Sequence, residues 1–103
     1  MSIEIHKYAF NGPHADLKKI EDRSGVYAIL AKKSDNEYAI IDIGESSMLY
    51  SRLLNHDRKE CWQECCGNAI YYAVHYTHNA QKPGRMEIEQ ELRNLYDLPC
   101  GKR

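Results

Sequence analysis

The chain has 103 residues, 43% hydrophobic and 28% charged, which suits one globular domain and argues against disorder. Fourteen basic and fifteen acidic residues leave a formal net charge of −1, so the chain lacks the overall basic surplus typical of phosphate binders, although a cleft can still concentrate positive charge. No apolar run reaches membrane-span length and the N-terminus lacks a signal-peptide core, so we expect a soluble, cytoplasmic protein with no membrane partner.

The first half of the chain reads mainly as strands. Residues 3–10 alternate loosely between polar and apolar side chains, which predicts an edge strand, and Pro13 is placed to begin a short helix over residues 14–22. Residues 26–31 and 37–43 are rich in β-branched and aromatic side chains and are separated by a polar turn. This pattern predicts a β-hairpin.

After this hairpin the apolar spacing becomes helical. We expect a helix over residues 48–59, a third strand over 69–77, a loop over 79–84 and a last helix over 85–97. This order predicts one α+β domain spanning residues 1–103, with a small three-stranded, mainly antiparallel sheet flanked by helices.

Four cysteines stand at positions 61, 65, 66 and 100. In a cytoplasmic protein a disulfide framework is not expected, and the paired spacing of a zinc site is present on one side only. We therefore expect buried free thiols, with a zinc- or redox-responsive site as the alternative.

Two polar residues follow the hairpin at helical spacing. At about 100° per residue, His56 falls on the same helix face as Leu49 and Leu53, and Arg52 falls at the border of that face. One interpretation is a hydrogen-bonded core histidine beside an arginine whose charged end reaches water. The other is a pair that faces a reaction site.

A carboxylate lies beside the apolar stripe of the last helix. Glu89 borders that stripe next to Tyr96, where burial is costly unless a cation or a donor meets the charge. The alternative is a surface pair with Arg85, one turn earlier, which would stabilise the helix by only about 0.3–0.5 kcal/mol.

Taken together, these residues form a pattern. Gly25-Val26-Tyr27, then Asp42-Ile43-Gly44, then Arg52 and His56, and finally Glu89 in the last helix resemble the motifs of the GIY-YIG nuclease family. The resemblance covers about residues 24–101, including Cys61-Trp62 and Pro99-Cys100, and implies that family's compact sheet-and-helix domain.

The resemblance also implies roles for individual residues. Tyr27 would position or deprotonate the attacking water, Arg52 would neutralise the scissile phosphate, and His56 would support or transfer a proton. Glu89 would hold a single Mg²⁺ or Mn²⁺ ion. The supporting residues would be Gly25, Asp42, Gly44 and Arg85.

The implied activity is a divalent-metal-dependent endonuclease that hydrolyses DNA phosphodiester bonds, with RNA as an alternative substrate and a homodimer as one way to cut both strands. The alternative function is a catalytically inactive module that binds nucleic acid or a protein partner through the same cleft.

The second motif departs from the family, because Asp42 stands where a tyrosine is expected and Glu45 follows the glycine. Asp42 could repel phosphate, join Glu89 on the metal, or serve as a base, and the sequence leaves these alternatives open.

Overall fold

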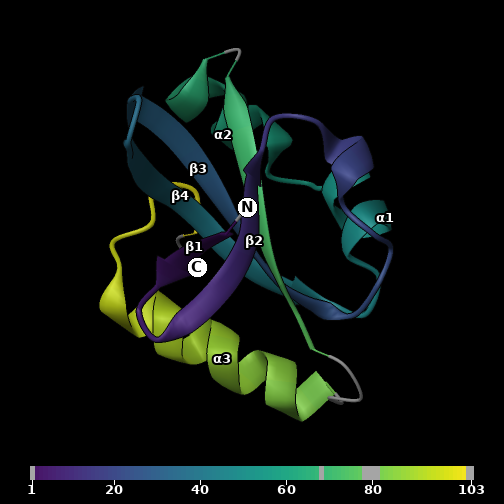
Figure 1. The fold of residues 1–103 in the computed structure, drawn as a ribbon. Coiled ribbons are helices and arrows are strands. Elements are labelled where there is room, and N and C mark those ends of the chain that lie inside the picture. Colours follow the sequence, from purple (N-terminus) through teal and green to yellow (C-terminus); the bar gives the residue numbers. More distant parts are fainter. Residues whose placement is uncertain (1, 68, 78–81, 102–103) are drawn as a thin grey trace.

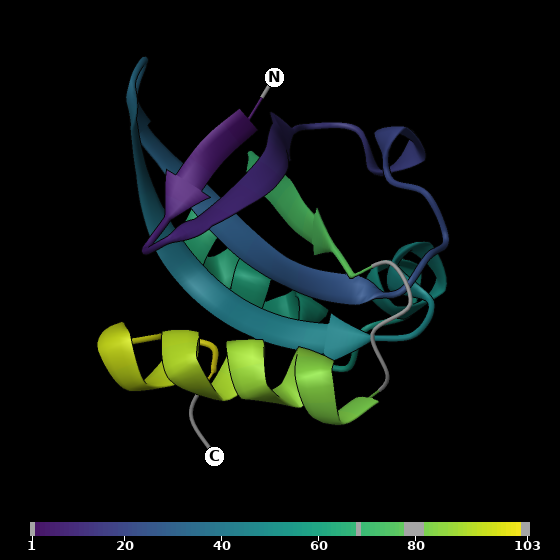
Figure 2. The same ribbon diagram turned by 60° about the horizontal axis from the view of Figure 1, so that its bottom comes forward.

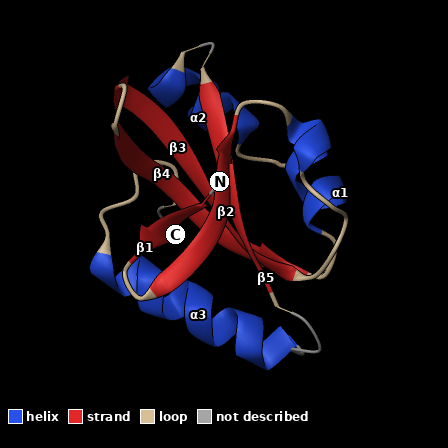
Figure 3. Cartoon of the chain, in the orientation of Figure 1, coloured by secondary structure: helices blue, strands red, loops and turns tan. Residues whose placement is uncertain are grey.

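A computed structural model describes residues 2–67, 69–77 and 82–101 of the chain. Its strands are β1 (Ser2–Ile5), β2 (Tyr8–His14), β3 (Gly25–Ser34), β4 (Glu37–Ser46) and β5 (Ile70–Tyr76). Its helices are a short 3₁₀ turn (Leu17–Lys19), α1 (Leu49–Leu54), α2 (Lys59–Cys66) and α3 (Lys82–Leu95). Figure 1 shows their arrangement, and Figure 3 separates strands from helices by colour.

The sheet has five strands in the order β1-β2-β5-β3-β4, with every neighbouring pair antiparallel. It curves into a half-barrel, which Figure 2 shows from the side. The α+β class agrees with the sequence prediction, but the expectation of a three-stranded sheet is wrong. The two additional strands come from the N-terminal segment.

That segment folds as a hairpin because the chain turns at His6 and Lys7, with His6 in the left-handed region at a φ of 58°. Pro13 does not begin a helix but lies within β2, at a register irregularity between Asn11 and His14. A residue without an N–H is tolerated at such an irregularity. Only the 3₁₀ turn remains of the helix predicted over residues 14–22.

The predicted hairpin and third strand are confirmed as β3, β4 and β5. β5 pairs with β3 and β2, and β4 and β1 form the two edges of the sheet. In the β3–β4 ladder, Tyr27 stands opposite Gly44 and Ile29 opposite Asp42. Paired residues point to the same side of a sheet, so the first and second motifs share one face.

The two faces of the sheet carry separate cores. On one face Tyr27 and Ile29 pack with Leu49 and Leu53 of α1 and with Trp62 of α2. On the other face the β1–β2 hairpin and α3 cover the sheet, and their core includes Ile5, Phe10, Val26, Ile43 and Leu92. α2 and α3 therefore contact β4 from opposite sides of the sheet, as Figure 2 shows.

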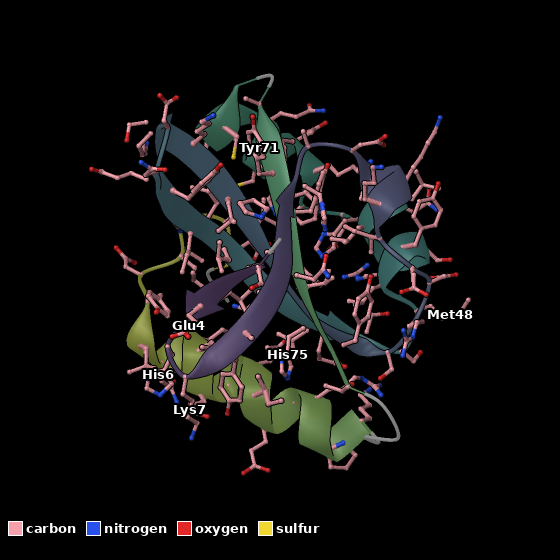
Figure 4. All side chains as sticks on the ribbon, in the orientation of Figure 1. Glu4, His6, Lys7, Met48, Tyr71 and His75 are labelled. Carbon is pink, nitrogen blue, oxygen red and sulfur yellow. A yellow bond between two sulfur atoms is a disulfide. The ribbon has the colours of Figure 1, made fainter. Side chains whose placement is uncertain are left out.

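The β1–β2 hairpin is also tied to α3 by charge. His6 Nε2 and Lys7 Nζ each lie 3.2 Å from Glu91 Oε2, at the end of the sheet where Figure 4 labels both residues. Tyr8 Oη donates a further hydrogen bond to Glu91. Glu91 thus faces the N-terminal hairpin.

The predicted helix over residues 48–59 is wrong in its continuity. The chain leaves α1 after Leu54 and starts α2 at Lys59, because the backbone N–H of Arg58 donates to His56 Nδ1 (3.0 Å) instead of continuing the helix. The last helix begins at Lys82, so Lys82–Gly84 are helical rather than looped, and residues 79–81 of the predicted loop lie outside the described residues. None of the helices in the described ranges is long and apolar enough to cross a membrane.

The prediction of buried free thiols is wrong: two of the four cysteines form a disulfide, and of the two free ones Cys65 is exposed and Cys66 only partly buried. Cys61 on α2 and Cys100 in the C-terminal segment form a disulfide with a Cα–Cα distance of 5.7 Å. The two meet because the backbone N–H of Cys100 donates to Ile41 O (3.1 Å), which returns the C-terminal segment to β4 beside α2. Cys65 and Cys66 are free.

Candidate functional site

Tyr27 lies across Gly44, and only glycine permits this. A Cβ at position 44 would stand 2.1 Å from Tyr27 Oη and 2.2 Å from its Cζ. The tyrosine ring therefore occupies the space that a side chain on β4 would fill. Gly25 has a similar role at the start of β3, where a Cβ would lie 2.4 Å from the backbone oxygen of His75. Both motif glycines allow close packing.

A hydrogen bond joins Tyr27 to His56. Tyr27 Oη lies 2.5 Å from His56 Nε2, and His56 Nδ1 accepts from the Arg58 backbone. A ring whose Nδ1 accepts carries its proton on Nε2, so His56 donates to the tyrosine oxygen. Burial lowers the pKa of His56 to about 4, helped by Arg52 and Arg58. The imidazole is therefore neutral at pH 7, and its 3.3 Å contact with Asp57 is not an ion pair there.

The Tyr27 hydroxyl is protonated at neutral pH. Burial raises its pKa to about 12, and Asp42 adds to the increase, while Arg58 and Arg52 oppose it. Arg58 Nη2 also donates to Tyr27 Oη over 3.4 Å. With two donors on its oxygen, the hydroxyl keeps its own proton to direct at a third group.

Asp42 is fully buried at the β4 edge and accepts four hydrogen bonds. Its Oδ2 accepts from Arg58 Nε (2.7 Å) and Trp62 Nε1 (2.8 Å), and its Oδ1 accepts from the Ile43 backbone (2.8 Å) and Arg93 Nη2 (3.5 Å). A carboxylate offers about four acceptor positions, so this one is saturated. In this state Asp42 neither ligates a metal nor acts as a base, and we call it and its four donors the Asp42 cluster.

Glu89 reaches the same edge from α3. Its side chain is 14% exposed, and its Oε1 lies 4.0 Å from Arg93 Nε, one helical turn away. The charge of Glu89 raises the pKa of Tyr27 slightly, which places the two within electrostatic reach. Arg93, a member of the Asp42 cluster, thus lies near both the Glu89 and the Asp42 carboxylates.

The other predicted residues sit at the rim. Arg52 is 41% exposed and pairs with Asp57 (3.1 Å). Arg85 is buried and does not form the exposed surface pair considered above. Its Nε donates to Glu45 Oε2 (2.9 Å), and its Nη1 donates to Ser24 Oγ (3.1 Å). Glu45 and Asp42, the two acids that depart from the family motif, are therefore each neutralised by arginine.

The fold brings Tyr27, His56, Gly44, Asp42 and Glu89 to one edge of the sheet. It leaves Arg52 facing solvent and His56 hydrogen-bonded at both ring nitrogens. This arrangement fits the interpretation of a satisfied core histidine beside an exposed arginine, and it also leaves the tyrosine–histidine pair next to the arginines.

Sequence reasoning missed three members of the site, namely Arg58, Trp62 and Arg93. Arg93 follows Glu89 by four residues, and this i, i+4 spacing was an available signal. Trp62 was noted only as part of the Cys61-Trp62 pair in the family resemblance, and Arg58 gave no signal, because the positions of both in the site depend on the break between α1 and α2.

Among the residues expected to hold a metal, the site offers the Glu89 carboxylate, which lies 4.0 Å from Arg93 Nε. The three-cysteine group Cys61, Cys65 and Cys100 is a separate cluster of soft ligands, and the disulfide occupies two of its sulfurs. Comparison of the chain with protein-family models, with curated proteins and with solved structures gives no match.

Proposed function

We propose that this protein is a divalent-metal-dependent endonuclease of the GIY-YIG type that hydrolyses phosphodiester bonds in DNA. One observation carries the proposal: Tyr27, His56 and Arg58 contact one another beside Gly44, whose missing side chain leaves room for the tyrosine ring. Glu89 of α3 is linked to them through Arg93 and Asp42. A core built for packing alone needs none of these polar groups, and each costs desolvation.

In the proposed hydrolysis, separate side chains orient the water and bind the phosphate. The Tyr27 hydroxyl orients the attacking water, and His56 fixes the hydroxyl by donating to its oxygen. Arg52, exposed at the rim, meets the phosphate, for which a guanidinium supplies paired donors. Arg58, 30% exposed, lies between Tyr27 and the rim and is the second cation available to the phosphate.

Glu89 would hold the metal. Mg²⁺ and Mn²⁺ accept oxygen ligands, and Mg²⁺ commonly uses one or two carboxylates with water and substrate phosphate completing the shell. The donor set at the β4 edge fits such a weakly anchored ion, with Asp42 contributing nothing because it is saturated. When bound, the metal would supply stabilisation of the charge that develops on the phosphate.

A second candidate function is an inactive module that binds nucleic acid or a protein partner. A specific observation favours it: Tyr27 is only 1% exposed, and Asp42 engages both Arg58 and Arg93. In this state the Tyr27 hydroxyl is buried and accepts a hydrogen bond from Arg58. The two candidates differ in whether the arginines leave Asp42 when phosphate arrives.

The test is cleavage of single-stranded, duplex, branched and supercoiled DNA and of RNA, with Mg²⁺ or Mn²⁺. We expect Glu89→Gln and Tyr27→Phe each to lower the cleavage rate by at least about 100-fold. Glu87→Gln, on the exposed side of the same helix, and Tyr72→Phe, in the same core as Tyr27, are matched controls that should keep the rate.

The outcomes separate the two candidates. Cleavage that survives Glu89→Gln would refute the assignment of that residue. Absence of cleavage, together with DNA binding that weakens in Arg52→Gln, would favour the inactive binding module. Absence of both cleavage and nucleic-acid binding would refute the nuclease and the nucleic-acid module together.

A further inference from the structure

Three sulfur atoms gather where α2 meets the C-terminal segment. Cys61 and Cys100 are bonded, and Cys65 Sγ lies 3.7 Å from Cys100 Sγ. All three sulfurs lie within 4.8 Å of one another. Because a disulfide sulfur carries no proton, Cys65 is the donor in its contact with Cys100. A free thiol is thus in contact with a disulfide.

The Cys65 thiol is accessible to solvent, and the neighbouring Cys66 thiol is less accessible. Cys65 is exposed, whereas Cys66 is partly buried and its Sγ contacts the backbone oxygen of Leu30 at 3.7 Å. Burial raises the pKa of Cys66, which lowers its fraction of nucleophilic thiolate at neutral pH. Cys65 is therefore the thiol placed to react, and Cys66 is its internal control.

We propose that Cys61, Cys65 and Cys100 form a thiol–disulfide exchange site in which Cys100 alternates between the two cysteines of α2. The Cys65 thiolate attacks Cys100 Sγ, the Cys65–Cys100 bond forms, and the Cys61–Cys100 bond breaks with Cys61 leaving as thiolate. The proton lost by Cys65 is balanced by one gained by Cys61 from water. One disulfide and one thiol exist before and after, so the step needs no external oxidant or reductant.

The helix provides two equivalent partners for Cys100. Cys61 and Cys65 are four residues apart on α2, so both lie on the same helix face, about one turn apart. Cys100 is held in place independently of its disulfide, because its backbone N–H donates to Ile41 O. The central sulfur therefore stays while its partner changes.

The exchange site adjoins the Asp42 cluster. Cys61 precedes Trp62, which donates to Asp42, and Gly101 follows Cys100 with so little space that a Cβ there would lie 3.0 Å from Asp42 Oδ1. Arg93, which donates to Asp42, also donates to Gly101 O. A change in the disulfide partner of Cys100 should therefore alter the surroundings of the buried Asp42 carboxylate. The fluorescence emission of Trp62, the single tryptophan, can report this change.

The experiment locates the free thiols of the intact protein. The protein is equilibrated at pH 8.5 in a glutathione buffer that permits one disulfide and is then labelled rapidly with excess N-ethylmaleimide at pH 6.5. Peptide mass mapping identifies the labelled cysteines. We expect a fraction of molecules to carry the label on Cys61, this fraction to persist in Cys66→Ser, and its complete loss in Cys65→Ser.

A second measurement does not depend on trapping speed. In Cys61→Ser, Cys65 and Cys100 should form a disulfide in the same buffer, and in Cys65→Ser, Cys61 and Cys100 should do so. In the wild type, label on Cys61 reports the Cys65–Cys100 disulfide and label on Cys65 reports the Cys61–Cys100 disulfide. The equilibrium constant for forming Cys65–Cys100 divided by that for forming Cys61–Cys100 should therefore equal the ratio of label on Cys61 to label on Cys65.

Three outcomes would overturn the proposal. One is label on Cys65 but never on Cys61 in the wild type. Another is a Cys61→Ser variant that keeps its far-ultraviolet circular dichroism but forms no Cys65–Cys100 bond. The third is label on Cys61 that survives Cys65→Ser, which would assign the exchange to glutathione alone.

Discussion

Replacement of Asp42 by asparagine tests how the β4 edge is held together. The substitution keeps the shape of the side chain but removes its charge and places an amide NH₂ where an arginine or an indole N–H now donates. Asp42 is fully buried and accepts from Arg58, Trp62, Arg93 and the Ile43 backbone. The variant keeps one acceptor oxygen, so the two donors that face the new NH₂ lose their acceptor, and both arginines lose the charge that they neutralise.

Removal of one partner of a buried ion pair typically costs about 3–5 kcal/mol. Here the cost should lie near the lower limit, about 3 kcal/mol, because Arg58 is 30% exposed and can turn to water, whereas Arg93 is only 10% exposed. For a domain of this size, 3 kcal/mol corresponds to a decrease in Tm of about 12–24 °C.

Urea unfolding monitored by circular dichroism measures the effect, with Asp57→Asn as the control. Asp57 also pairs with an arginine, but its side chain is 74% exposed, so its replacement should destabilise the fold far less than Asp42→Asn does. If the two variants lost the same free energy of unfolding, the Asp42 cluster would not stabilise the fold and the reasoning above would be wrong.

Two further predictions concern the tyrosine–histidine pair. Gly44→Ala should lower the free energy of unfolding by about 1–3 kcal/mol in the same urea assay, because the new Cβ overlaps the Tyr27 ring; an unchanged stability would show that the ring has another place to lie. For His56, unfolded chains bind a proton below the ordinary pKa of 6.5 but the folded chain only below about 4. Wild-type stability should therefore be full above pH 6.5 and fall by up to about 3 kcal/mol as the pH decreases to 4, and His56→Gln should lack this part of the decrease. Parallel pH profiles for the two proteins would contradict the buried, neutral histidine.

The sequence predicted those parts of the fold that local residue types determine. The β3–β4 hairpin and β5 follow from runs of β-branched and aromatic residues bounded by polar turns, and both are present. The sequence predicted one edge strand over residues 3–10 where the structure has a hairpin, because the turn at His6 contains no glycine or asparagine that would indicate a turn. Pro13 indicated a helix start because its place in a sheet irregularity depends on pairing with β5, which is not local.

The candidate site shows the same division. Tyr27, Gly44 and Glu89 could be found from motif order and from helix periodicity. Helix periodicity predicted His56 on the core-facing side of a continuous helix, and His56 is buried. It is buried for a different reason, because the helix stops before it and its Nδ1 accepts from the Arg58 backbone. The disulfide depends on the return of the C-terminal segment to β4, and a separation of 39 residues carries no signal for that return.

The substitution in the second motif changes the electrostatics of the site in a definite way. A tyrosine at position 42 would bring a neutral hydroxyl, whereas Asp42 brings a buried charge that requires cations, and Arg58 and Arg93 supply them. The extra acids that the sequence suggested would repel phosphate are thus already neutralised. The same neutralisation engages Arg58, one of the two cations that could meet a phosphate. Under the proposed function, a phosphate that binds there must therefore compete with Asp42 for this arginine, and the proposed cleavage requires that the phosphate win that competition.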